Sequence, residues 1–109
     1  INAITTFNDM IFIVGDLGVF SFSRENKTWE FLFPSIIYEN NKINSIVVNN
    51  RYLFLGSNNG LFRIDKNTGF IRDYKFTFIG QVNDLFIDKN ILWIGSSKGL
   101  IKFKWKRDI

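Results

Sequence analysis

Three copies of one pattern run through the sequence, and this repetition limits the possible folds more than any other feature. The copies begin with Ile1-Asn2-Ala3-Ile4, Ile43-Asn44-Ser45-Ile46 and Val82-Asn83-Asp84-Leu85. In each copy an apolar stretch ends in a glycine, at Gly15, Gly56 and Gly95, and a second glycine follows at Gly18, Gly60 and Gly99. A unit of about 40 residues cannot bury its hydrophobic face alone, so neighbouring units must stack on one another.

Apolar and polar residues alternate within each copy, as in Phe20/Phe22, Phe62/Ile64 and Ile101/Phe103. A period of two is typical of β-strands, and no segment shows a helical period. Clusters of Gly, Asn, Asp and Ser lie between these stretches and favour tight hairpins. The second copy therefore predicts strands at about 43–48, 52–56, 61–65 and 70–76, and the first copy predicts its fourth strand near 28–33.

Four short antiparallel strands in about 40 residues are typical of one blade of a β-propeller. We therefore expect an all-β fold, a propeller fragment of about three four-stranded antiparallel blades, with repeats at 1–42, 43–81 and 82–109 forming one partial domain. The last blade is incomplete and is expected to end with a strand from Leu100 to Lys106. Large rings are expected to fill the space between blades, namely those of Trp29, Phe31, Phe33, Phe54, Phe62 and Trp93.

Three blades do not close a ring, because propellers contain about four to eight. The remaining blades are expected to come from a longer parent chain or from other copies of this chain, for example two chains that make six blades. The sequence starts at Ile1 with neither an initiator Met nor a signal-peptide pattern, which favours an excised or mature segment.

Composition and charge exclude several function classes. The absence of Cys and His excludes disulfides, thiolate metal sites and Ser-His-Asp triads. The net charge of +4 arises in residues 98–109, and the preceding residues hold nine basic (14 − 5) and nine acidic (10 − 1) side chains. A nucleic-acid partner is therefore not expected. The longest apolar run, Met10 to Val14, is too short for membrane insertion, which needs about 20 residues.

Two further patterns suggest chemistry that the surrounding residues argue against. Residues 65–69 begin like a calcium loop, but Phe76 stands where such a loop needs Glu, so we predict a hairpin turn and neither a metal nor a cofactor. Paired carboxylates could serve a glycosidase or lyase, but no signal brings two of them to within about 5 Å, and we predict no enzymatic activity. The carboxylates considered are Asp65, Asp73, Asp84 and Asp88. The lysines of 101–106 are expected on one solvated face of a strand.

The third copy, from Val82-Asn83-Asp84-Leu85 to Leu92-Trp93-Ile94-Gly95-Ser96-Ser97-Lys98-Gly99-Leu100, resembles the two-component regulator propeller repeat. The second copy matches it in Leu53-Phe54-Leu55-Gly56-Ser57-Asn58-Asn59-Gly60-Leu61, and the first in Phe12 to Val19, with Ile13 at the place of the repeat's tryptophan. The resemblance implies a periplasmic sensory propeller of a hybrid two-component system from a Bacteroides-like bacterium, which responds to an oligosaccharide. The alternatives are a protein-interaction scaffold and, with less support, a propeller lyase or hydrolase.

Blade topology suggests where a ligand would bind. The turns between second and third strands share one face with the connections from a fourth strand to the next first strand, and such loops carry binding residues in many folds. Amide and aromatic groups suit sugar hydroxyls and ring faces. The candidate ligand-binding residues on this face are Tyr38, Asn40, Asn58, Asn59, Ser97 and Lys98.

Overall fold

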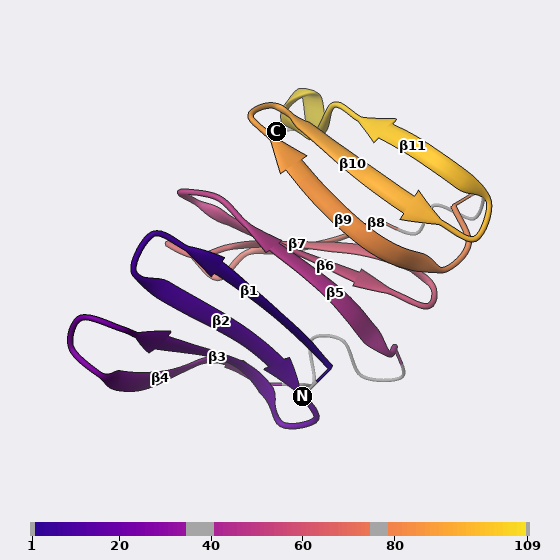
Figure 1. The fold of residues 1–109 in the computed structure, drawn as a ribbon. Helices are drawn as coiled ribbons and strands as arrows, with labels where there is room; N and C mark the ends of the chain where they lie inside the picture. The colour runs from indigo at the N-terminus through magenta and orange to yellow at the C-terminus, as the bar shows by residue number, and fades with distance from the viewer. Residues whose placement is uncertain (1, 35–40, 75–78, 109) are drawn as a thin grey trace.

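Three antiparallel sheets make up the computed structural model, which describes residues 2–34, 41–74 and 79–108 (Figure 1). The strands of blade 1 are β1 (Ala3–Phe7), β2 (Met10–Gly15), β3 (Gly18–Ser23) and β4 (Thr28–Pro34). Those of blade 2 are β5 (Ile43–Val48), β6 (Tyr52–Ser57), β7 (Gly60–Asp65) and β8 (Ile71–Tyr74). Those of blade 3 are β9 (Val82–Asp88), β10 (Ile91–Ser96) and β11 (Gly99–Phe103). The predicted all-β fold is confirmed, and no helix within the described ranges has the length and apolar character needed to cross a membrane.

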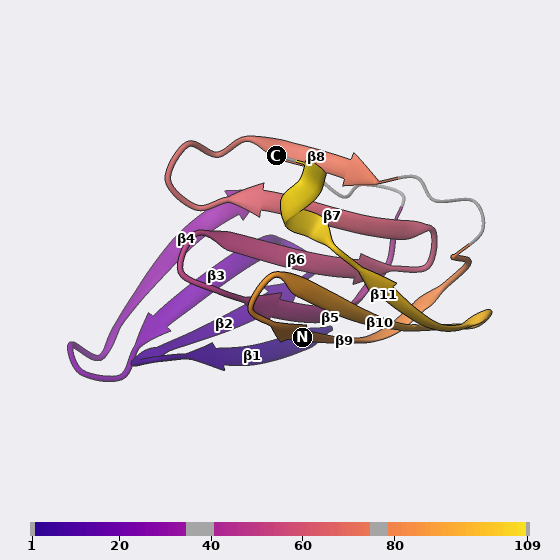
Figure 2. The ribbon, with the colours of Figure 1, turned by 90° about the horizontal axis from the view of Figure 1, so that it is seen from above.

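The sheets are arranged around a common edge. Strands follow chain order within each sheet, and β5, the first strand of blade 2, contacts both β1 and β9, the first strands of blades 1 and 3. Figure 2 shows these first strands gathered along one edge, with β4 and β8 on the far side. Sheets that share an inner edge and pack face to face are the arrangement of propeller blades.

Cross-strand pairing fixes which residues of the blades are equivalent. In each blade, the hairpin between the second and third strands is closed by an equivalent cross-strand pair. These pairs are Gly15–Gly18, Ser57–Gly60 and Ser96–Gly99. Aligning the three blades on this pair gives the blade alignment used below. The expected equivalence of Gly15 with Gly56 is wrong by one position, because Val14 holds the place of Gly56. For the same reason Phe12, not Ile13, stands at the place of Trp93.

Blade 2 is buried on both faces because it lies between the other two blades. Along β6, Leu53 and Leu55 pack against blade 1, while Tyr52 and Phe54 pack against blade 3. All four side chains are at most 8% exposed. A middle strand that is apolar on both faces is thus explained by two interfaces, each supplied by alternate side chains.

The outer blades depart from the predicted aromatic packing. Phe54 and Phe62 are buried between blades as expected, but Trp29 is 63% and Phe31 54% exposed. Both lie on the face of blade 1 that points away from blade 2. These rings are exposed because none of the sheets formed by residues 2–34, 41–74 and 79–108 covers that face.

The end of the chain also differs from the prediction. Strand β11 stops at Phe103, and Trp105–Asp108 form a 3-10 turn instead of continuing the strand. The Trp105 ring turns inward and packs on Tyr52 and Phe54 with centroid distances of 5.4 Å to each. Burial of this ring between blades competes with strand extension, so Lys104 and Lys106 do not share a strand face with Lys102. The expected strand 70–76 is described only as β8, since residues 75–78 lie outside the described ranges.

Gly56 allows blades 2 and 3 to approach closely, and its substitution tests this packing. A Cβ at this position would lie 2.2 Å from Ser45 Oγ and 2.5 Å from Val82 Cγ1. We expect Gly56→Ala to lower the free energy of unfolding by about 1–3 kcal/mol, as overpacked cores do. Urea unfolding followed by circular dichroism measures the change.

Gly15→Ala is the matched control, because nothing lies within 4 Å of a Cβ built there. Its free energy of unfolding should stay within about 0.5 kcal/mol of the free energy of unfolding of the unsubstituted protein. Equal effects of the two substitutions would contradict the close approach at Gly56.

Candidate functional site

A cleft of about 540 Å³ opens between blades 2 and 3, where the β5–β6 and β9–β10 hairpins lie side by side. The 3-10 turn after β11 forms its third wall. Three amides, three cations and two aromatic rings line the cleft, from Asn49, Asn50, Arg51, Tyr52, Lys89, Asn90, Trp105 and Lys106.

Local hydrogen bonds hold the blade 2 wall of the cleft. The Asn49 side-chain Oδ1 accepts hydrogen bonds from the backbone amides of Arg51, at 3.0 Å, and Tyr52, at 2.7 Å. An Asn side chain that accepts the backbone amides of residues two and three positions further along the chain is a common turn former. In the β9–β10 hairpin, Lys89 takes a left-handed backbone conformation with φ of 54°, which tightens the turn.

Arg51 is held by an ion pair with Asp65. Its Nε and Nη2 atoms each lie 2.9 Å from Asp65 Oδ2, and Asp65 Oδ1 accepts the backbone amides of Asn67 and Thr68 at 2.8 and 3.2 Å. The predicted hairpin turn at 65–69 is confirmed. Burial raises the pKa of the Asp65 carboxyl, but the hydrogen bonds from Arg51 and the two amides lower it by more, so this pKa lies below the ordinary aspartate value.

The lowered pKa of Asp65 predicts a pH-dependent stability. A carboxyl with a depressed pKa in the folded state stabilises the fold above its unfolded pKa of about 3.9, and this contribution is lost as pH falls through the folded pKa. We expect Asp65→Asn, which keeps a turn-forming oxygen, to reduce the loss of stability between pH 5 and pH 2. Urea midpoints across this range measure it, and identical pH profiles for the two proteins would refute it.

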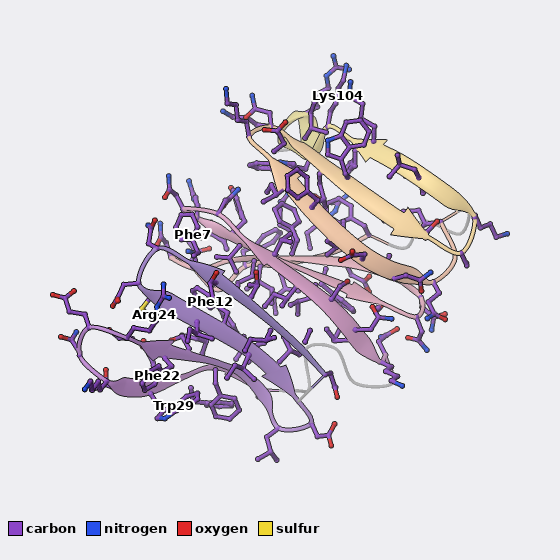
Figure 3. All side chains as sticks on the ribbon, viewed as in Figure 1. Phe7, Phe12, Phe22, Arg24, Trp29 and Lys104 are labelled. Carbon is purple, nitrogen blue, oxygen red and sulfur yellow. The ribbon has the colours of Figure 1, made fainter. Side chains whose placement is uncertain are left out.

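Blade 3 carries unbalanced positive charge beside the cleft. In the blade alignment, Lys104 of blade 3 corresponds to Asp65 of blade 2, and Asn90 corresponds to Arg51. Blade 3 therefore has an ammonium group where the Arg51–Asp65 ion pair of blade 2 has its carboxylate. A neighbouring cleft of about 400 Å³ is lined by Asn90, Ile91, Lys104, Lys106 and Arg107. Figure 3 shows Lys104 projecting at this end of the blade. The local field therefore favours an anionic or strongly polar ligand.

Trp105 supplies a buried aromatic wall with an unused donor. Its side chain is 5% exposed, and its indole Nε1 has no hydrogen-bond partner among the described residues. A buried N–H without a partner is costly, so the burial of this indole rests on the packing of its ring against Tyr52 and Phe54. The arrangement can hold a polyhydroxylated or acidic molecule through the amides and cations of the cleft.

The sequence-predicted binding residues lie at the opposite ends of the strands. Asn58 and Asn59 form the β6–β7 turn beside the end of the 34–42 connection, as predicted. Asn58 Oδ1 accepts the Lys42 amide at 3.0 Å, and Asn59 Nδ2 donates to Asn41 Oδ1 at 3.4 Å. Asn58 thus anchors the connection between blades 1 and 2. Tyr38 and Asn40 lie outside the described residues.

Ser97 and Lys98 occupy the matching turn of blade 3. Ser97 Oγ accepts the Gln81 amide at 3.1 Å, just as Asn58 Oδ1 accepts that of Lys42. The Lys98 amide donates to Ser96 Oγ, and the Lys98 side chain is exposed. Structural bonds therefore use the side-chain oxygens of Asn58 and Ser97, and a binding role for this loop face stays a prediction.

Sequence reasoning missed the cleft because its walls come from two blades and from the end of the chain. A signal was available in the recurring Asn-containing hairpins at 49–50 and 89–90. The sequence did not predict the inward turn of Trp105, because the alternation of apolar and lysine residues in 101–106 favours a continued strand.

Comparison with known proteins identifies the architecture. No family model matches the chain, and no curated protein matches it. Among solved structures, a chain of the mitotic checkpoint complex superposes on 96% of this chain with a TM-score of 0.78 and 16% identity. The extracellular domain of the putative hybrid two component system BT4673 from B. thetaiotaomicron superposes on 89% with a TM-score of 0.69 and 20% identity. BamB from Moraxella catarrhalis superposes on 91% with a TM-score of 0.67 and 22% identity.

The chain spans only part of each of these proteins. It covers 34% of the checkpoint chain, 13% of the BT4673 domain and 29% of BamB. At these identities the likeness shows the propeller-like fold, which proteins of unrelated function share.

Proposed function

We propose that this chain is part of the ligand-sensing propeller of a hybrid two-component sensor, placed in the periplasm, and that the sensor responds to an oligosaccharide. The observation that carries the proposal is the superposition on the extracellular domain of a putative hybrid two component system over 89% of the chain. The resemblance of all three copies to the two-component regulator propeller repeat supports the same assignment.

The cleft between blades 2 and 3 is the proposed binding site. Amides and cations that line one cavity donate hydrogen bonds to sugar hydroxyls. The function is binding without catalysis, and the Asp65 carboxylate serves an ion pair and a turn. The loop face with Asn58, Asn59, Ser97 and Lys98 is the second candidate surface.

Calorimetric titration with a panel of neutral and acidic oligosaccharides tests the proposal. For the best ligand we expect Lys89→Asn and Lys106→Gln each to weaken binding about tenfold, since a charged hydrogen bond contributes about 1.5–3 kcal/mol. Asn tolerates the left-handed backbone at position 89, so the turn is kept. Lys98→Gln removes the same charge from the opposite face and should leave affinity unchanged.

Other results would assign the chain differently. Weaker binding in Lys98→Gln alone would move the site to the loop face. Binding of a protein partner and of no sugar would favour the interaction scaffold. Release of reducing sugar from a polysaccharide would show an enzyme and contradict the proposal.

A further inference from the structure

A cavity of about 180 Å³ lies between blades 1 and 2, beside the outer strand β4. Blade 1 supplies most of its lining, and Lys66 in the β7–β8 turn is the contribution of blade 2. Both walls belong to the described sheets, and neither is an outer face of the three-blade unit. The cavity is therefore distinct from the cleft between blades 2 and 3.

Cross-strand pairing places Phe12, Ser21 and Glu30 next to one another on the face of blade 1 that points toward blade 2. Ser21 pairs with Phe12 of β2 and with Glu30 of β4, and paired residues of neighbouring strands share a face. Phe12 packs in the interface with blade 2, and Figure 3 shows it on that side of blade 1. Phe12 and Ser21 are at most 4% exposed and form the floor of the cavity, whereas Glu30 is exposed at its mouth.

A short side chain at position 21 leaves this cavity open. In the blade alignment, Ser21 corresponds to Arg63 of blade 2, which is buried in the interface with blade 3. The Arg63 guanidinium lies 5.2 Å from the Tyr52 ring centroid and donates a hydrogen bond to the Tyr74 hydroxyl. The Ser21 hydroxyl, in contrast, has no hydrogen-bond partner among the described residues. Blade 1 thus has a cavity where blade 2 has a long side chain with partners.

The apolar walls of the cavity are accessible. Met10, Leu32 and Phe33 pack on the core between blades 1 and 2, but each is only partly buried. Strand β4 has a β-bulge at Leu32, because Phe31 and Phe33 pair with consecutive residues of β3. The bulge lets two successive apolar side chains line the same cavity. Apolar cavities of about 150 Å³ accept a molecule of the size of benzene, so this cavity has room for the side chain of leucine.

One cation and one anion line the cavity without pairing. Lys66 Nζ donates to Asn49 O at 2.7 Å and lies 5.2 Å from the Phe7 ring centroid and 5.5 Å from that of Phe12. An ammonium group has three donors, so it can donate further hydrogen bonds. Neither Lys66 nor Glu30 has an ion-pair partner within the described ranges. Burial lowers the pKa of Lys66, and a carboxylate beside it would oppose that shift.

We propose that the cavity between blades 1 and 2 binds an apolar α-amino acid of about the size of leucine. The ligand side chain packs on Met10, Leu32 and Phe33, its carboxylate accepts a hydrogen bond from Lys66, and its ammonium group donates one to Glu30. Such charge-assisted bonds are the stronger ones, and a zwitterion matches both charges at once. A neutral sugar would leave both charges unmatched against apolar walls. The inference does not rest on the oligosaccharide proposal.

Calorimetric titration with L-leucine tests the ligand class. We expect saturable binding at one site per chain. Isocaproate lacks the ammonium group of leucine and isoamylamine lacks its carboxylate, so each should bind at least tenfold more weakly. The absence of saturable leucine binding would overturn the proposal. Equally tight binding of isocaproate or of isoamylamine would overturn the recognition of a zwitterion.

Substitutions in the cavity test its location. Ser21→Met fills the cavity from its floor and removes the unpartnered hydroxyl. We expect this variant to unfold at a urea midpoint no lower than that of the unsubstituted protein and to bind no leucine. Glu30→Gln changes an exposed residue and should weaken leucine binding at least tenfold. Undiminished binding in either folded variant would overturn the proposed site.

Two control substitutions complete the test. Glu25→Gln removes the same charge from the exposed β3–β4 turn of blade 1, outside the cavity, and should leave leucine binding unchanged. Lys89→Asn alters the cleft between blades 2 and 3 and should also leave it unchanged. Equal losses in Glu25→Gln and Glu30→Gln would reveal a general effect of charge, and weaker binding in Lys89→Asn would move leucine to the other cleft. Either result would overturn the assignment.

Discussion

Replacing Phe54 by alanine is expected to lower the free energy of unfolding by about 3–5 kcal/mol, among the largest losses for one substitution in this chain. The ring is fully buried and packs on Tyr52 and Trp105, so its removal leaves a cavity between blades 2 and 3. Domains of this size are stable by only about 5–15 kcal/mol. Urea unfolding followed by circular dichroism measures the loss.

Phe70→Ala is the control for this substitution. Phe70 is 59% exposed in the β7–β8 turn, so the same truncation should cost less than about 0.5 kcal/mol. A small effect of Phe54→Ala would mean that blades 2 and 3 are not packed through this ring.

Trp105→Ala is expected to cost a similar loss of about 3–5 kcal/mol. Trp105 belongs to no strand, yet its ring is 5% exposed and holds the 3-10 turn against blade 2. Its Nε1 has no partner among the described residues, so Trp105→Phe removes an unpaired donor while keeping an aromatic ring. We expect Trp105→Phe to cost about 1 kcal/mol or less, since it avoids most of the cavity. Urea unfolding of both variants, followed by circular dichroism, makes the comparison.

The contrast between alanine and phenylalanine separates packing from hydrogen bonding. Equal, large losses would show that the indole N–H has a partner. No loss in Trp105→Ala would show that residues 105–108 are not packed on the blades, and the cleft would then lack one wall.

Much of the fold follows from alternation and turn chemistry. The predicted ranges 43–48, 52–56 and 61–65 agree with β5, β6 and β7 to within one residue at each end. Local rules succeed here because side chains of a strand alternate between two interfaces, and Asn, Gly and Asp mark the hairpins. The register of the first copy was less secure. A glycine after an apolar run does not show which residues pair, and only the pairing of Gly15 with Gly18 placed Phe12 opposite the correct neighbours.

The candidate site was less predictable than the fold. The sequence suggested loops at the end of the strands where Asn58 and Ser97 lie, and the structure shows that their side-chain oxygens anchor the chain connections. The cleft combines Arg51, Lys89 and Trp105, which are far apart in sequence. No local pattern predicts their meeting, because it depends on how two blades pack.

By itself, the sequence determined that the chain forms short strands, that they group into three units of one kind and that each unit has apolar surfaces to bury. These properties are local, since they depend on side-chain period and turn residues. Tertiary structure alone decided which surfaces are buried, where Trp105 turns inward and which rings remain exposed. Such outcomes depend on packing between segments distant in sequence, where a face is covered only if a neighbouring blade is present.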